Sequence, residues 1–107
     1  MKILLVDDDP YILRIVPPIL ERAGHKVTTF HDLEEAKKAV GGFDLVVTDG
    51  SVNKHRDGIA WAAQLKTHNT KVVILSGEPP VVGPKGVPFV QKGSGYKSNL
   101  LDAVKSI

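Results

Sequence analysis

Short apolar runs alternate with segments whose apolar residues recur at helical spacing, and this alternation organises the whole chain. The runs predict strands at 2–6, 26–30, 43–48, 71–75 and 89–91. Helices are predicted at 10–23, from residue 32 to about 40, from residue 57, and from 98 or 99 to 107. Strands alternating with helices favour a parallel sheet covered on both faces. We therefore expect an α/β fold with a doubly wound, five-stranded parallel sheet.

Several residues have side chains suited to the ends of these helices. Asp9 is a good N-cap for the first helix, and Gly24 is suited to end it. Asp32, with a glutamate three residues later, resembles a capping box. Asp57 is expected to cap the third helix, and Ser98 or Asn99 the last one.

Proline interrupts the pattern in two places. Pro17-Pro18 lies within the first predicted helix, where each proline removes a backbone donor and clashes with the preceding turn. We predict a kink or break near Arg14 to Val16. In the second place, seven of the twelve residues at 77–88 are Gly or Pro, so no regular helix is expected between the fourth and fifth strands.

Length and composition narrow the class of protein. A chain of 107 residues predicts one domain, 1–107. There is no cysteine, which excludes disulfides and thiolate metal sites. The net charge of +2 is scattered, without the basic stripe of a nucleic-acid-binding module, and no segment has the pattern of a membrane span or a signal peptide. We expect a cytoplasmic protein without nucleic-acid or membrane binding.

Polar and charged side chains stand where the predicted strands end. Asp7 and Asp8 follow the first strand, Asp49 the third, Ser76 the fourth and Lys92 the fifth. In a doubly wound sheet these strand ends meet at one edge. Three carboxylates, a hydroxyl and an ammonium suit Mg²⁺ together with a phosphoryl group, and one carboxylate is available to attack phosphorus.

The ordered segments KILLVDDDP, FDLVVTD, RDGIAWAAQLK, VVILSG, PFVQKG and LLDAVKSI resemble a response-regulator receiver domain, of the chemotaxis-regulator-like kind. The resemblance covers essentially the whole chain. It implies a flavodoxin-like sheet in the order 2-1-3-4-5. It also implies a signalling module that catalyses only its own phosphotransfer and dephosphorylation, rather than an enzyme with a separate substrate.

The resemblance assigns roles to the strand-end residues. Asp49 would be the phosphoacceptor and a metal ligand. Asp8 would bind Mg²⁺ or Mn²⁺ directly, Asp7 largely through water, and the carbonyl of Ser51 would be another ligand.

The remaining roles concern the phosphoryl group and the switch. Lys92 would pair with the acceptor carboxylate and then with phosphoryl oxygens. Ser76 would be the switch hydroxyl, and Phe89 matches the family's switch aromatic.

Four features depart from the family pattern. Asn53 replaces a usual proline, and the loop from Asp49 to Asp57 has one extra residue, with Lys54-His55-Arg56 filling it. Gly93 replaces the proline after the lysine, where the family often has a cis peptide bond. The Pro/Gly segment replaces the fourth helix, which predicts an altered output surface or a weakened switch.

Three functions fit this pattern. The first is a phosphorylatable receiver that takes phosphate from a histidine kinase or phosphotransfer protein and acts on an unidentified downstream protein. The second is a pseudo-receiver, an interaction module that does not switch. The third is a small haloacid-dehalogenase-like phosphatase using Asp7 as nucleophile. Against this third alternative, no acidic residue follows Lys92 until Asp102, and there is no cap domain.

Overall fold

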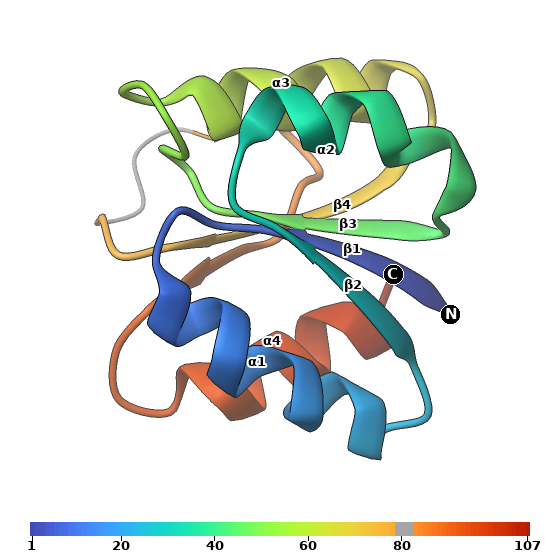
Figure 1. The fold of residues 1–107 in the computed structure, drawn as a ribbon, viewed down its shortest axis with the longest axis vertical. Coiled ribbons are helices and arrows are strands. Elements are labelled where there is room, and N and C mark those ends of the chain that lie inside the picture. The colour runs from blue at the N-terminus through green and yellow to red at the C-terminus, as the bar shows by residue number, and fades with distance from the viewer. Residues whose placement is uncertain (79–82) are drawn as a thin grey trace.

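The computed structural model describes residues 1–78 and 83–107, and it contains a central sheet between two layers of helices (Figure 1). Helices α2 and α3 cover one face, and α1 and α4 cover the other. The elements in chain order are β1 Lys2–Val6, α1 Pro10–Arg22, β2 Lys26–Phe30, α2 Leu33–Ala39, η1 Val40–Gly42, β3 Leu45–Thr48, α3 Asp57–Thr67, β4 Lys71–Ser76, β5 Phe89–Gln91 and α4 Tyr96–Lys105.

The sheet has five parallel strands in the order β2-β1-β3-β4-β5. The predicted fold class and strand order are therefore confirmed. The register places Val6 beside Thr48, and Thr48 beside Ile74. The residues that follow β1 and β3 consequently start at the same level of the sheet.

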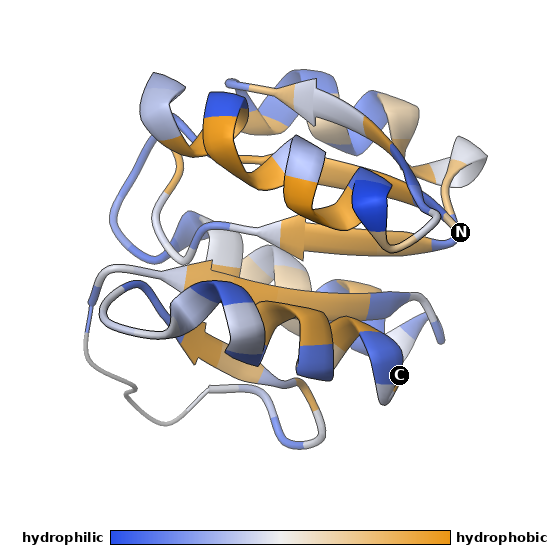
Figure 2. Ribbon diagram, turned by 90° about the horizontal axis from the view of Figure 1, so that it is seen from below, coloured by the Kyte–Doolittle hydropathy of each residue, from blue (hydrophilic) through white to orange (hydrophobic). Residues whose placement is uncertain are grey.

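The apolar core has two layers because the central strands are buried on both faces (Figure 2). On one face Ile3, Leu5 and Val47 pack with residues of α1 and α4. On the other, strand residues pack with α2 and α3, and Trp61 of α3 is 5% exposed within this layer. Burial on both faces explains why these strands are nearly continuous apolar runs.

Three of the predicted helix ends are confirmed. The side chain of Asp9 accepts a hydrogen bond from Tyr11 N at 2.9 Å. That of Asp32 accepts one from Glu35 N at 3.1 Å. Gly24 follows α1 with a φ of +95°, a left-handed conformation in which glycine is favoured.

Two predicted N-caps are wrong. Helix α4 begins at Tyr96, before Ser98 and Asn99, and Gly95, with a φ of +78°, occupies the N-cap position without a side-chain hydrogen bond. Helix α3 has no side-chain cap, since Asp57 is already its first residue and its carboxylate points back to the preceding loop.

Helix α1 runs without interruption through Pro17 and Pro18, so the predicted break is wrong, while the kink stays a prediction. The prolines deprive the carbonyls of Leu13 and Arg14 of their helical partners. Pro18 and Arg14 are exposed, so water has access to that side of the helix. The buried face, with Val16 and Leu20, holds the helix on the sheet.

The connection from β4 to β5 contains no helix in its described parts, 77–78 and 83–88, as expected; residues 79–82 lie outside the described structure. Val87 and Phe89 pack partly against the core on the α2/α3 face. A Cβ on Gly86 would lie 3.2 Å from Lys66 Cε, so this segment also touches α3.

Candidate functional site

An acidic cluster forms where β1 and β3 end. The backbone N–H of Asp7 bonds Phe30 O at 3.1 Å, and that of Asp49 bonds Val6 O at 2.9 Å, so both residues continue the ladder of the sheet. Each of Asp7, Asp8 and Asp49 offers a carboxylate oxygen within 4.8 Å of the others. The three predicted carboxylates are therefore brought together.

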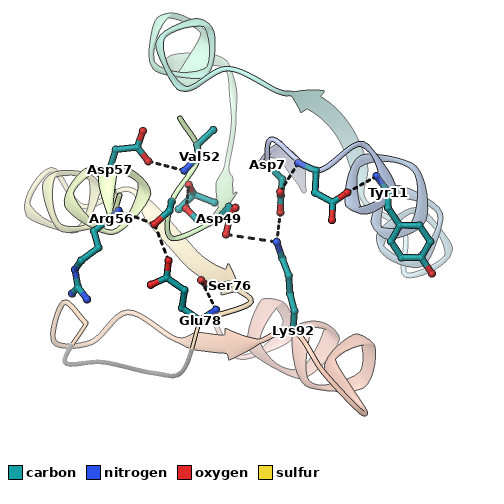
Figure 3. A network of polar contacts seen from close by, with 12 residues as sticks. Asp7, Tyr11, Asp49, Val52, Arg56, Asp57, Ser76, Glu78 and Lys92 are labelled. Carbon is teal, nitrogen blue, oxygen red and sulfur yellow. Dashed lines mark hydrogen bonds and ion pairs between the residues drawn. The ribbon is translucent and has the colours of Figure 1, made fainter. Parts of the chain in front are cut away.

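Lys92 reaches this cluster from the end of β5 (Figure 3). Its Nζ lies 2.7 Å from Asp7 Oδ2 and 3.6 Å from Asp49 Oδ1. Its backbone N–H bonds Ser76 O at 2.7 Å, which places it in register with the end of β4. The ammonium thus neutralises part of the charge of two carboxylates.

Burial controls the ionisation of the cluster. Burial removes water from the Asp49 carboxylate, and the nearby charge of Asp7 repels it. Burial is the larger cause, and together they raise the pKa of Asp49 to about 6. Burial also raises the pKa of Asp7, although Lys92 opposes this. For Lys92, burial disfavours the ammonium, but the hydrogen bond and charge of Asp7 outweigh it, and the pKa is raised. The site therefore has more negative charge than its one cation compensates.

Ser76 is buried at the end of β4, and its hydroxyl lies beside the chain that leaves Asp49. A Cβ on Gly50 would be 2.9 Å from Ser76 Oγ. This oxygen accepts a hydrogen bond from Glu78 N at 3.2 Å. The Glu78 carboxylate in turn accepts one from Ser51 Oγ at 3.2 Å, which joins the loops after β3 and β4. No motif or spacing in the sequence points to this role of Glu78.

The loop between β3 and α3 is organised by Asp57. Its carboxylate accepts hydrogen bonds from Val52 N at 2.7 Å, Lys54 N at 2.9 Å and Asn53 N at 3.0 Å. Partial burial opposes ionisation, but these bonds outweigh it and lower the pKa of Asp57. The residue type of Asp57 predicts a helix cap, whereas its carboxylate binds the loop that precedes the helix.

Gly58 packs directly on the backbone of the predicted acceptor. A Cβ at this position would overlap the Asp49 carbonyl oxygen. The same carbonyl accepts a hydrogen bond from Thr48 Oγ1 at 2.9 Å. Only glycine, which has no Cβ, lets α3 come this close to the Asp49 backbone, so a glycine directly after Asp57 indicates the contact in the sequence.

Three other residues singled out by the sequence lie in the loops and strands around the carboxylates. Ser51 is half-buried in the loop after Asp49, where its hydroxyl also accepts from Arg56 N at 2.7 Å. Phe89 is half-buried against the α2/α3 core. The Lys92–Gly93 peptide bond is trans, like every other peptide bond that the structure describes.

The donor set suits a hard divalent cation. Asp7 is 1% and Asp49 8% exposed, whereas Asp8 is exposed, and three carboxylates with one lysine leave excess negative charge at the site. Oxygen-only donors at this density favour Mg²⁺ or a similar ion over softer metals. The acidic residues present therefore fit a site for Mg²⁺.

The sequence profile of the response regulator receiver domain matches residues 3–82. Together with the fold and the acidic site, this match shows that the chain belongs to the response-regulator receiver family of two-component systems. Domains of this family are signalling modules rather than classical enzymes.

Similar proteins agree with this assignment. The chain is 34% identical over 76 residues to the transcriptional regulatory protein CpxR of Escherichia coli (strain K12), covering 70% of this chain and 33% of that protein. The chain thus spans about a third of the length of that relative. The sequence match of CpxR from Klebsiella pneumoniae is similar, 35% over 77 residues, again covering 70% of this chain and 33% of that protein.

Solved structures show the same fold. The response regulator TrrA of Thermotoga maritima, in complex with Mg²⁺-BeF, aligns with a TM-score of 0.83 and 25% identity, covering 98% of this chain and 96% of that one. DrrB of Thermotoga maritima aligns with a TM-score of 0.81 and 27% identity over 97% of this chain and 50% of its own.

Within the described residues, no helix has the length and apolar character needed to cross a bilayer.

Proposed function

We propose that residues 1–107 form a receiver domain in which Asp49 accepts a phosphoryl group from the phosphohistidine of a kinase or phosphotransfer protein. The observation that carries this proposal is the buried Asp49 carboxylate, which shares its surroundings with Asp7, Asp8 and the Lys92 ammonium. An Asp49 oxygen attacks phosphorus, the P–N bond to the donor breaks, and the donor imidazole keeps its electron pair.

Asp7, Asp8, Asp49 and the carbonyl of Ser51 would hold the metal. When bound, Mg²⁺ would supply positive charge to the carboxylates and to the oxygens of the transferring group. Asp8 is exposed and Asp7 buried, which supports direct access of Asp8 to a hydrated ion and a role of Asp7 at the floor of the site.

Lys92 and Ser76 would bind the phosphoryl oxygens. Lys92 is held near Asp49 by its bond to Asp7, so its ammonium is positioned before the phosphoryl group arrives. Ser76 would exchange the hydrogen bond from Glu78 N for one that its hydroxyl donates to phosphate. Phe89 would then respond to the movement at Ser76.

The switched surface would act on a downstream protein, with no nucleic acid or membrane bound by this chain. We place the domain in the cytoplasm, where its kinase would present phosphohistidine.

One observation favours a second candidate function, the pseudo-receiver. Residues 83–88 contain no helix, so the surface beside Phe89 differs from that expected of a switching receiver. In this case the chain would bind its partner without phosphorylation. The family assignment leaves the hydrolase alternative without support.

Intact-protein mass spectrometry after incubation with acetyl phosphate and Mg²⁺ tests the proposal. We expect wild type to gain one phosphoryl group, Asp49→Asn to gain none, and a metal-free sample to gain none. Asp102→Asn removes an exposed carboxylate of α4 and should behave as wild type. Since rapid hydrolysis could hide the product, beryllofluoride binding is measured alongside.

Absence of both the mass increase and beryllofluoride binding would refute phosphorylation and favour the pseudo-receiver. A mass increase that survives in Asp49→Asn would place the acceptor elsewhere.

A further inference from the structure

We propose that Asn53 is a positioning residue of the metal site, because its side chain ties the loop that carries Ser51 to the first N–H of α2 and thereby sets the affinity for Mg²⁺. This inference rests on the proposed function, in which the Ser51 carbonyl is a metal ligand. Asn53 itself touches neither metal nor phosphate.

The tie is a single hydrogen bond between distant parts of the chain. Asn53 Oδ1 accepts from Leu33 N at 2.8 Å. Leu33 is the first residue of α2, and the first N–H groups of a helix have no partner within it. The Asp32 side chain serves Glu35 N instead. Asn53 therefore supplies an acceptor that the helix's own cap does not provide to Leu33.

Asn53 is also held from the opposite side. Its N–H donates to Asp57 Oδ2 at 3.0 Å, on the first residue of α3. The neighbouring Val52 is 2% exposed and packs in the same apolar cluster as Leu33 and Ile59. The loop is thus fixed between α2 and α3 by polar contacts and by an apolar side chain, two residues beyond Ser51.

These contacts replace two other sources of rigidity. The loop has no strand or helix of its own between residues 50 and 56, so no backbone ladder fixes the Ser51 carbonyl. Asn53 also stands where the family usually has a proline, whose ring restricts φ. The hydrogen bond to α2 restricts the loop through the side chain instead, which limits the freedom that metal binding must otherwise remove.

Linkage makes the effect reciprocal. If the Asn53–Leu33 bond favours the loop conformation that binds metal, bound metal favours the Asn53–Leu33 bond by the same factor. Mg²⁺ should therefore slow exchange of the Leu33 amide hydrogen, although Leu33 is in another element and contributes no ligand.

Two measurements test this, and neither needs phosphorylation. Isothermal titration calorimetry gives the Mg²⁺ dissociation constant of wild type, Asn53→Ala, Asn53→Asp and the control Asn99→Ala, which alters an exposed asparagine of α4. NMR hydrogen exchange at Leu33, with and without Mg²⁺, reports the tie itself, with the Asn99 amide as reference.

We expect Asn53→Ala to bind Mg²⁺ about three- to tenfold more weakly, the effect of one lost hydrogen bond. Asn53→Asp keeps an acceptor and should retain the slow exchange at Leu33. Asn99→Ala should match wild type.

An unchanged dissociation constant in folded Asn53→Ala would overturn the inference. If that variant does not fold, wild type alone decides, because Mg²⁺ that binds without slowing exchange at Leu33 also overturns it. Failure of wild type to bind Mg²⁺ would instead sink the proposed function, so the two failures are distinguishable.

Discussion

Lys92 lies closer to Asp7 than to the proposed acceptor: its Nζ is 2.7 Å from Asp7 Oδ2 and 3.6 Å from Asp49 Oδ1. The Asp7 side chain is 1% exposed, whereas that of Lys92 is 19% exposed. The lysine is therefore the counter-ion of the buried Asp7 carboxylate, as well as a group near the proposed acceptor.

Removal of this counter-ion should destabilise the domain. Lys92→Ala leaves a buried carboxylate unpaired, and we expect the free energy of unfolding to fall by about 2 kcal/mol at pH 7, below the cost for a fully buried pair. Urea denaturation measures this fall in the free energy of unfolding. Lys97→Ala, at an exposed position of α4, should change little. The pairing would be unimportant if Lys92→Ala and Lys97→Ala had the same stability.

The pKa of Asp49 predicts a pH-dependent gain of stability on its removal. The folded-state pKa of about 6 lies above the usual 3.8, so between these values the folded protein binds more protons than the unfolded chain, and stability falls as pH rises. Asp49→Asn should therefore have little effect at pH 4 and stabilise by about 2 kcal/mol above pH 7.

Urea denaturation of wild type, Asp49→Asn and Asp102→Asn between pH 4 and 8 measures this difference. A gain for Asp49→Asn that is independent of pH, or a loss of stability, would contradict the assigned direction of the pKa shift.

The Asp57 carboxylate should stabilise the loop after Asp49. Asp57→Ala leaves three backbone N–H groups without this acceptor, and we expect a loss of about 1 to 2 kcal/mol. Because its pKa is lowered, the contribution is present above the unfolded value of 3.8 and is lost as pH falls through the folded value.

Thermal unfolding of wild type and Asp57→Ala from pH 2.5 to 7 measures the size of the stability loss and the direction of its change with pH. The gap between wild type and Asp57→Ala should narrow only at the acid end, and a gap that widens there would rule out the carboxylate as its cause.

Gly58→Ala tests the close approach to Asp49. The added methyl group would overlap the Asp49 carbonyl oxygen, so the helix or the acceptor backbone must move. We expect a loss of at least about 2 kcal/mol, despite the better helix propensity of alanine, and weaker Mg²⁺ binding. Gly41→Ala meets no atom within 4 Å and is the matched control. Equal melting temperatures for the two variants would show that the contact is not restrictive.

The sheet and the strand-end residues were predictable because both follow from local patterns. Continuous apolar runs predict strands buried on two faces, and parallel topology then brings Asp7, Asp49 and Lys92 to one edge. Proline propensity was a poorer guide, since α1 continues through Pro17 and Pro18. There, packing of one apolar face outweighs the lost backbone bonds.

The contacts that organise the loops could not be predicted in the same way. Asn53 meets Leu33 across twenty residues, and Glu78 meets Ser51 across twenty-seven. Both pairs depend on how α2 and the β4–β5 connection lie over the sheet, and no periodicity encodes that. Asp57 fits an N-cap by residue type, and only the fold of the preceding loop turns its carboxylate the other way.

The hydrogen bonds that carry the sheet ladder past the ends of the strands have a consequence for protein engineering. Asp7, Asp49 and Lys92 are each bonded through their N–H to a neighbouring strand or the residue at its end. Their positions consequently depend on strand pairing, and the length of the connections on the surface has little influence on them. A designer should be able to replace the Pro/Gly connection beyond Glu78 with a helix from another receiver without rebuilding the carboxylate site around Asp49.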